Sequence, residues 1–127
     1  MAYPIDAALS EHYEQYEWTL YNSDYDTLEW SEKNAIPKPT KEDLESKLAV
    51  INAAEPMKRL RYERDRLLAE SDWVVTKASE TGVAETDAWK TYRQALRDLP
   101  STQTPAMEDT PTSQLGIKNV TWPTKPS

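Results

Sequence analysis

The feature that most constrains the fold is the regular spacing of apolar residues between positions 57 and 100. Apolar side chains recur at intervals of three, four and seven, which is the pattern of helices that each bury one face. The two sets are Met57, Leu60, Leu67, Leu68, Val74, Val75 and Ala78, then Ala88, Trp89, Tyr92, Ala95, Leu96 and Leu99. Thr81-Gly82 between the sets is a turn signal. The spacing predicts antiparallel helices over about 57–79 and 84–99, the second ended by Pro100.

A further helix is predicted just upstream, over about 40–55. Thr40-Lys-Glu-Asp43 has the form of a capping box, and three apolar residues follow at helical spacing: Leu44, Leu48 and Ile51. Pro56 removes a backbone hydrogen bond and clashes with the preceding turn, so it either ends this helix or bends it. Residues 41–55 and 57–79 are therefore expected to form one bent helix or two helices.

The first 36 residues predict a short helix followed by a β-hairpin. Residues 5–13 place apolar side chains on one helical face. Four apolar residues then alternate with polar ones on either side of a turn rich in Asn, Ser and Asp: Trp18, Leu20, Leu28 and Trp30. A two-stranded hairpin is only marginally stable alone. Its apolar face must therefore pack within the chain or dock on another protein.

Residues 101–127 are rich in Pro, Ser and Thr and lack periodicity, which predicts a linker and an extended C-terminal tail. Residues 117–123 either add as a short strand or lay Trp122 into a groove, as a clasp on the chain's own helices or as an anchor on another chain. The expected fold is mainly α with a small N-terminal β-hairpin (α+β), built on an antiparallel helical hairpin. Its expected divisions are 1–36, 37–100 and 101–127.

Composition excludes several classes of function. Among 127 residues, 15 Lys and Arg stand against 22 Asp and Glu, and the net charge of -7 makes nucleic acid an unfavourable partner. The chain has no cysteine, one histidine and no Gly-rich phosphate loop, so we expect no enzyme, no metal and no cofactor. We also expect no signal peptide and no membrane-spanning segment.

Arg64 interrupts the apolar stripe of the first predicted helix. Either its guanidinium extends to water, or it pairs with a carboxylate on the facing helix and fixes the register of the two helices.

Three strings of residues resemble a known family: Arg64-Asp-Arg-Leu-Leu-Ala-Glu-Ser-Asp-Trp73, Trp89-Lys-Thr-Tyr-Arg-Gln-Ala-Leu-Arg-Asp-Leu-Pro100 and Val120-Thr-Trp-Pro123. In this order they are similar to the tail assembly chaperone and tail fibre assembly proteins of tailed bacteriophages. The resemblance covers residues 61–123, and residues 18–40 are similar to N-terminal modules fused to that family. The sequence departs from the family at Val74-Val-Thr-Lys77, which continues apolar and helical.

The resemblance implies a chaperone that binds a tail fibre subunit, expected to be trimeric, and assists its folding, trimerisation or attachment without nucleotide. It would act in the host cytoplasm, with no membrane partner and with a possible hetero-oligomer with the fibre. The alternatives are a structural component retained on the virion tail, or a generic helical interaction module. Candidate partner-binding residues, expected to divide between core and interface, are Trp18, Trp30, Asp72, Trp73, Trp89, Tyr92, Arg93, Arg97, Trp122 and Pro123.

Overall fold

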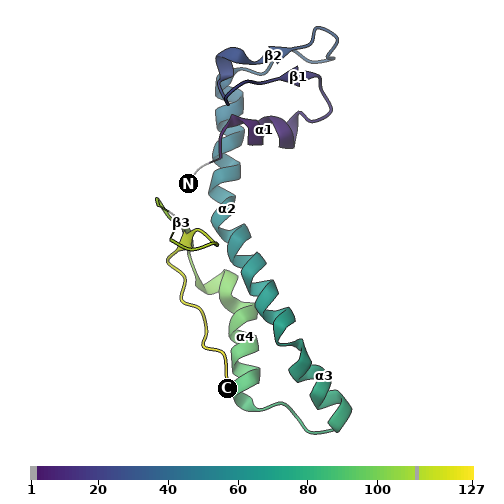
Figure 1. Cartoon of the computed structure of the whole chain (residues 1–127), viewed down its shortest axis with the longest axis vertical. Coiled ribbons are helices and arrows are strands. Elements are labelled where there is room, and N and C mark those ends of the chain that lie inside the picture. Colours follow the sequence, from purple (N-terminus) through teal and green to yellow (C-terminus); the bar gives the residue numbers. More distant parts are fainter. Residues whose placement is uncertain (1–2, 111) are drawn as a thin grey trace. The chain divides into compact units, whose positions relative to one another are not determined.

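A computed structural model of the chain describes residues 3–110 and 112–127, and these form two compact units (Figure 1). The units divide after Glu55, which lies inside helix α2 (Lys41–Glu70). The divisions expected from composition lie elsewhere, at 36/37 and 100/101. The first half of α2 groups with the hairpin, and the C-terminal tail groups with the second half of α2. These groupings depend on contacts between distant residues, which local composition cannot predict.

The N-terminal unit contains the predicted helix and hairpin. Its elements are α1 (Ile5–His12), β1 (Trp18–Thr19), the short 3-10 helix η1 (Tyr25–Thr27) and β2 (Glu29–Trp30). The strands are antiparallel, with Trp18 opposite Trp30, and each is only two residues long. Asn22 and Ser23 adopt positive φ in the connection, where short polar side chains tolerate the left-handed conformation. The predicted hairpin is therefore confirmed, with shorter strands than the alternation suggests.

A small apolar core holds this unit together. Its buried residues are Ala8, Leu9, Leu28 and Leu44, and Trp18, Leu20 and Leu48 are among those that pack on them. The hairpin's apolar face thus packs within the chain for three of its four predicted members. The fourth, Trp30, packs its ring against those of Tyr13 and Tyr16 at centroid distances of 5.9 and 5.6 Å.

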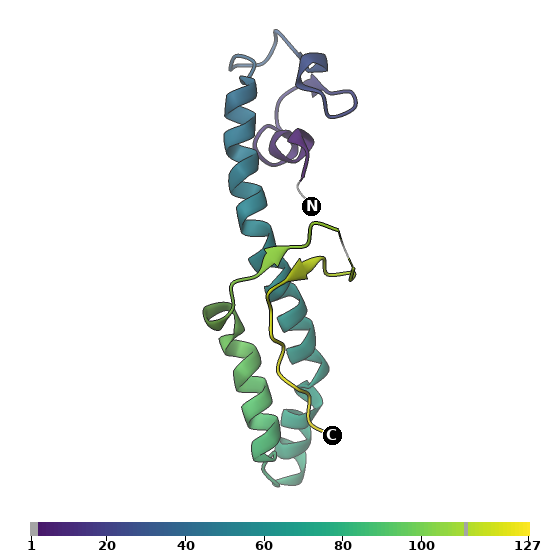
Figure 2. The ribbon, with the colours of Figure 1, turned by 90° about the vertical axis from the view of Figure 1, so that its left-hand side faces the viewer.

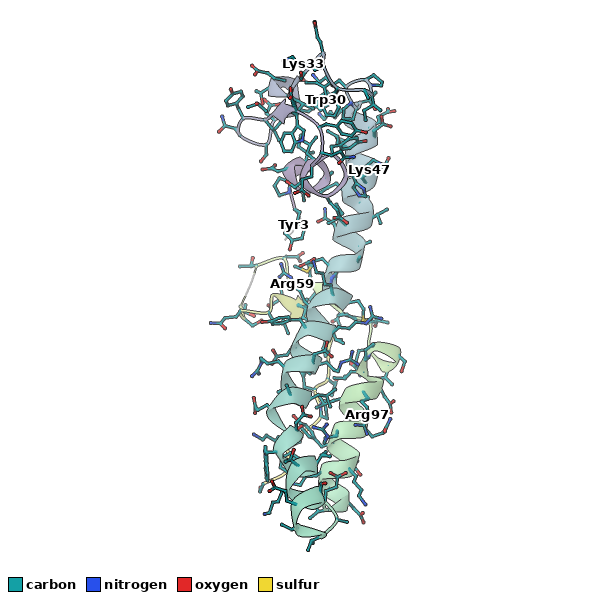
Figure 3. The ribbon with its side chains drawn as sticks, turned by 90° about the vertical axis from the view of Figure 1, so that its right-hand side faces the viewer. Tyr3, Trp30, Lys33, Lys47, Arg59 and Arg97 are labelled. Atoms are coloured by element: carbon teal, nitrogen blue, oxygen red, sulfur yellow. The ribbon has the colours of Figure 1, made fainter. Side chains whose placement is uncertain are left out.

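The start of α2 is fixed by the predicted capping box. The backbone N–H of Asp43 donates to the Thr40 hydroxyl at 3.1 Å, and the Thr40 N–H donates to the Asp43 carboxylate at 3.2 Å. These reciprocal bonds satisfy two donors that the first helical turn leaves free. The Tyr3 hydroxyl donates to Glu55 at 2.8 Å, which joins the N-terminal segment to the same helix (Figure 3).

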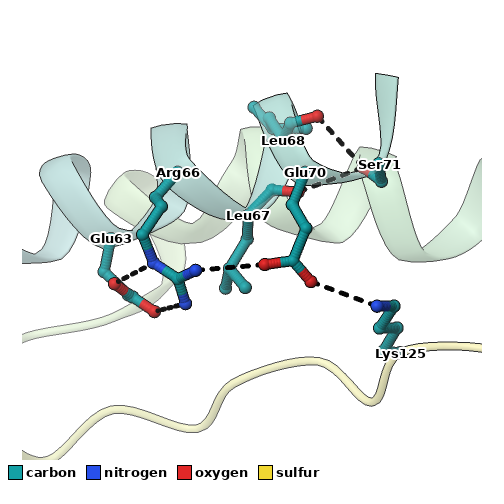
Figure 4. A network of polar contacts seen from close by, with 7 residues as sticks. All are labelled: Glu63, Arg66, Leu67, Leu68, Glu70, Ser71 and Lys125. Atoms are coloured by element: carbon teal, nitrogen blue, oxygen red, sulfur yellow. Dashed lines mark hydrogen bonds and ion pairs between the residues drawn. The ribbon is translucent and has the colours of Figure 1, made fainter. Parts of the chain in front are cut away.

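One predicted helix of the C-terminal unit is interrupted. The helix expected over 57–79 breaks at Ser71, which separates α2 from α3 (Asp72–Thr81). Upstream, α2 continues through Pro56, so of the two alternatives for residues 41–55 and 57–79 the single helix holds as far as Glu70. The break needs neither Gly nor Pro, because the Ser71 hydroxyl donates to the carbonyls of Leu67 and Leu68 and competes with the helical hydrogen bonds (Figure 4).

Helix α4 (Asp87–Thr102) begins three residues later than predicted and runs through Pro100. Its N-cap is Thr86, whose hydroxyl accepts from the N–H of Trp89. Pro100 lies in the last turn, where little helix remains to be disrupted, and the Ser101 and Thr102 hydroxyls satisfy the carbonyls of Asp98 and Leu99. Gly82, at φ 71°, ends α3 in the left-handed conformation that its lack of a Cβ allows.

The predicted linker instead carries a second strand pair. Strand β3 (Ala106–Met107) pairs antiparallel with β4 (Ile117–Lys118), and the segment after β4 follows the helices (Figure 2). Gly116 has φ 70°, and a Cβ there would lie 2.7 Å from the Arg59 guanidinium, which donates to the Leu115 carbonyl at 3.0 Å. The positive φ favours glycine at this turn, and a larger residue would also displace the end of the Arg59 side chain.

The core of the C-terminal unit consists of six buried residues: Leu60, Val74, Trp89, Tyr92, Leu96 and Leu99. Ile117, Val120 and Trp122 pack on it from the C-terminal segment. Residues 103–110 and 112–127, called the strap from here on, therefore fold back on the helices, as the clasp alternative predicts.

Candidate partner-binding site

The segments similar to phage chaperones meet in one seam between the helices, centred on Arg93. Its guanidinium donates to the Leu68 carbonyl at 2.9 Å, to the Ser71 hydroxyl at 2.5 Å and to the Asp72 carboxylate at 2.9 Å. The Arg93 side chain is only 11% exposed. These bonds attach α4 to the interruption between α2 and α3. Arg93 and Asp72 are both candidate partner-binding residues, and in this structure both hold the helices together; that either also binds a partner stays a prediction.

A second arginine contact fixes the direction of the pair. Arg64 donates to the Arg97 carbonyl on α4 at 3.3 Å, one turn further along than the Arg93 contact with Ser71. Because Arg93 meets residues 68–72 and Arg97 meets residue 64, the helices run antiparallel, as predicted.

Neither alternative for Arg64 describes what the structure contains. The side chain is 19% exposed, and its ion pair, at 2.7 Å, is with its sequence neighbour Asp65 and not with a carboxylate on α4. The acceptor on the facing helix is a backbone carbonyl, which a search for acidic residues cannot identify. The Arg97 side chain bonds Gln94 on its own helix and is exposed (Figure 3).

Three predicted aromatic residues form an edge-to-face series across the seam. Trp73 on α3 meets Trp89 on α4 with centroids 5.6 Å apart, and Trp89 meets Tyr92 at 5.9 Å. Trp89 and Tyr92 are buried at 8% and 5% exposure, whereas Trp73 is 52% exposed. Of the three, Trp89 and Tyr92 therefore build the core, and only Trp73 presents a large surface to a partner.

Beside Trp73 lies a hollow of about 220 Å³ between α3 and the start of α4, called the α3–α4 groove from here on. Its lining is mostly apolar and includes Trp73, Val74, Val83 and Trp89. Val83, in the turn after Gly82, is 69% exposed. Small-molecule pockets usually have volumes of roughly 300–1,000 Å³. A single apolar side chain of another protein suits this groove better than a cofactor.

The charged members of the groove are Lys77 and Glu85. The Glu85 Oε2 atom is buried and accepts no hydrogen bond from the described residues, whereas Lys77 is exposed. Val83, Lys77 and Glu85 were not predicted as site residues. Val83 had a signal, as an apolar residue in a turn, but spacing gives no indication that Glu85 would be buried.

The strap places the remaining predicted residues of this unit. Trp122 is half-buried against the core, and Pro123 lines a hollow beside α4. The Lys125 ammonium pairs with Glu70 at 3.1 Å, at the end of a series in which Arg66 bridges Glu63 and Glu70 (Figure 4). The bond from Lys125 lowers the pKa of Glu70, and Glu63 raises the pKa of Arg66 further above its usual value.

A second carboxylate organises the loop between β3 and β4. Glu108 accepts from the hydroxyls of Thr112 and Ser113 and from the Thr112 N–H. The hydrogen bond from Thr112 is the main cause that lowers the pKa of Glu108, and desolvation opposes it. These groups have structural roles in the strap.

Trp18 and Trp30 lie in the N-terminal unit, and both indole N–H groups already have acceptors. Trp18 donates to the Tyr13 carbonyl and Trp30 to the Ile36 carbonyl, each at 3.0 Å. The two residues line a shallow hollow along the hairpin. They hold the N-terminal fold, and the α3–α4 groove contains neither of them.

Across residues 3–110 and 112–127, no group of three or more His, Asp or Glu side chains is arranged to hold a metal ion. No helix in the described part of the chain is both long and apolar enough to cross a membrane.

Comparison with known protein families identifies a match to the C-terminal unit. A family model described as phage tail assembly chaperone protein matches residues 57–127, which is more than half of the chain. The matched range corresponds closely to the C-terminal unit, with its seam, groove and strap. No curated protein and no solved structure matched.

Proposed function

Because the chain belongs to the phage tail assembly chaperone family, we propose that the tail protein it binds is a tail fibre subunit. In this proposal the chain covers apolar surface of the subunit and helps it to fold, trimerise or attach, without nucleotide. The observation that carries the proposal is the α3–α4 groove, an exposed apolar site within the family-matched unit.

The groove has the properties of a small protein-binding site. Trp73 is exposed by 52% but rests edge-on against the buried Trp89, so it is held in place before any partner arrives. Tryptophan is enriched among residues that dominate binding energy, and a side chain held in advance loses less entropy on binding. Val83 adds a second exposed apolar side chain to the lining of the groove.

The proposal is tested by expressing the chain together with a tail fibre protein from the same phage. The chaperone should raise the yield of soluble, trimeric fibre, and Val83→Asp should remove most of that gain. Val50→Asp is the matched control, because Val50 is 70% exposed against 69% for Val83 but lies in the N-terminal unit.

A fibre that trimerises equally well without the chain would overturn the proposed role. Mass spectrometry of purified virions distinguishes the alternative: a chain that stays on the mature fibre as a cap or adaptor would be found there in fixed proportion to the fibre.

A further inference from the structure

The charge around the α3–α4 groove differs from the charge of the unit that contains it. Residues 56–127 carry eleven Lys and Arg and ten Asp and Glu, a net charge of +1. Residues 72–87, which form α3 and the turn to α4, carry four acidic side chains and Lys77, a net charge of -3. Asp72 is paired with Arg93, and of the four acidic side chains Glu85 is the one that lines the hollow.

The burial of Lys77 and of Glu85 indicates which of the two would stabilise a bound partner more through an ion pair. Lys77 is exposed, so pairing it with a carboxylate would contribute little. Glu85 is partly buried, and its Oε2 accepts no hydrogen bond from the described part of the chain. A carboxylate that lacks donors in a partly desolvated site is stabilised by a donor from outside.

We propose that the α3–α4 groove recognises a segment in which an apolar side chain is followed by arginine or lysine. The apolar side chain enters the hollow between Trp73 and Val83, and the cation donates to the Glu85 carboxylate. This inference deepens the proposed function by giving the chemistry of the fibre segment, and it rests on that function only for the identity of the partner.

The test uses the full chain labelled with ¹⁵N and three peptides: acetyl-Gly-Leu-Arg-Gly-amide and its Gln and Glu counterparts. Titrations follow the backbone amides of residues 72–89 and the indole N–H signals of Trp73 and Trp89. We expect saturable shifts at peptide concentrations on the order of 1 mM, with the Arg peptide about fivefold tighter than the Glu peptide, as a partly exposed ion pair supports.

Glu85→Gln separates recognition from stability. The amide removes an incompletely bonded charge from the groove, so the variant should melt at the same temperature as the wild type or higher, yet lose the preference for Arg over Gln. Glu80→Gln, a change of equal charge on the exposed surface of α3, should leave both the preference and the melting temperature unchanged.

Three results would overturn the inference: a Glu peptide that binds as tightly as the Arg peptide, shifts confined to residues outside 72–89, or no saturable shift with any peptide. A preference for Arg that Glu80→Gln reduces as much as Glu85→Gln would also overturn it, because the recognition would then be by net charge alone. The fibre co-expression experiment is scored independently, so either proposal can fail while the other holds.

Discussion

The two units of this chain use their charged residues in opposite ways. Residues 3–55 carry twelve acidic and four basic side chains, a net charge of -8, and the carboxylates of residues 3–54 form no ion pair in the described structure. In the C-terminal unit the charges are nearly balanced, and Arg93, Arg64 and Lys125 all bond across to other elements. The C-terminal unit therefore uses ion pairs between elements, such as Arg93–Asp72 and Lys125–Glu70, and none is described for the carboxylates of residues 3–54.

Two of the four lysines in the N-terminal unit also contact rings. Lys38 lies 4.9 Å from the centre of the Tyr25 ring and Lys47 lies 5.9 Å from that of Tyr13. These two lysines contact aromatic rings and form no described ion pair with a carboxylate. Most of the negative charge of this unit is therefore not compensated by a nearby cation. Like-charge repulsion then opposes compaction of this unit.

Within the C-terminal unit, the largest expected effect is a difference in stability loss between a buried tryptophan, Trp89, and an exposed one, Trp73. Trp89→Ala should lower the free energy of opening, measured by hydrogen exchange at α4 amides, by about 3–5 kcal/mol, because it empties a buried site between Trp73 and Tyr92. Trp73→Ala should lower it by only about 1 kcal/mol. Equal losses would show that Trp73 belongs to the core.

The second-largest expected loss of stability comes from removing the Arg93 contacts in the seam. Arg93→Met should lower the same free energy by about 2 kcal/mol, since it removes the donor to the Leu68 carbonyl and leaves the buried Ser71 with one partner fewer. Arg97→Met is the control: its side chain bonds only Gln94 on its own helix, so we expect a loss under about 0.5 kcal/mol. If the two variants lose the same amount, Arg93 does not hold the helices together.

These contacts also show which parts of the fold were predictable. Apolar spacing and the capping box located α1, the hairpin, the start of α2 and the antiparallel pair, because each of these depends on neighbours within a few residues. The Ser71 hydroxyl bonds two backbone carbonyls and also accepts from Arg93, 22 residues away. Residue type does not reveal a carbonyl as an acceptor, which is why the contacts of Arg64 and Arg93 between the helices were not predicted.

The strap was missed for a related reason. A composition rich in Pro, Ser and Thr is typical of linkers, yet its few apolar residues find a surface already formed by the helices: Ile117, Val120 and Trp122. The groove was only partly predictable, since Trp73 was named from the sequence while Val83 and Glu85 emerged from the turn geometry.

Added salt should change hydrogen exchange differently in the two units, by a smaller amount than these substitutions do. Raising NaCl from roughly 0.05 to 0.5 M screens repulsion among exposed carboxylates, so hydrogen exchange should slow at α1 and the hairpin by an amount equivalent to about 1 kcal/mol or less. The amides of α4 should show no such gain, because the positive and negative charges of that unit are nearly equal in number. A uniform response along the chain would contradict the contrast between the units.

The smallest expected effect is a loss of strap protection in acid. The pKa values of Glu70 and Glu108 are lower in the folded chain than their usual 4.5. Their contribution is therefore complete above about pH 4.5 and is lost as the pH falls through the lower folded values. Protection factors, which correct for the intrinsic pH dependence of exchange, should fall at β3 and β4 in this window before they fall at α4, and Glu108→Gln should weaken this pH dependence. Protection factors of the strap that do not change with pH would show that these carboxylates do not hold it.

The central claim is that the C-terminal unit binds the tail protein through the α3–α4 groove. Hydrogen exchange of the full chain, measured with and without a tail fibre protein, tests this claim most directly. We predict slower exchange in the fibre's presence at residues 72–89 and none of that protection in Val83→Asp, while residues 16–31 exchange as before. Protection confined to residues 16–31, or protection at 72–89 that survives Val83→Asp, would contradict the account.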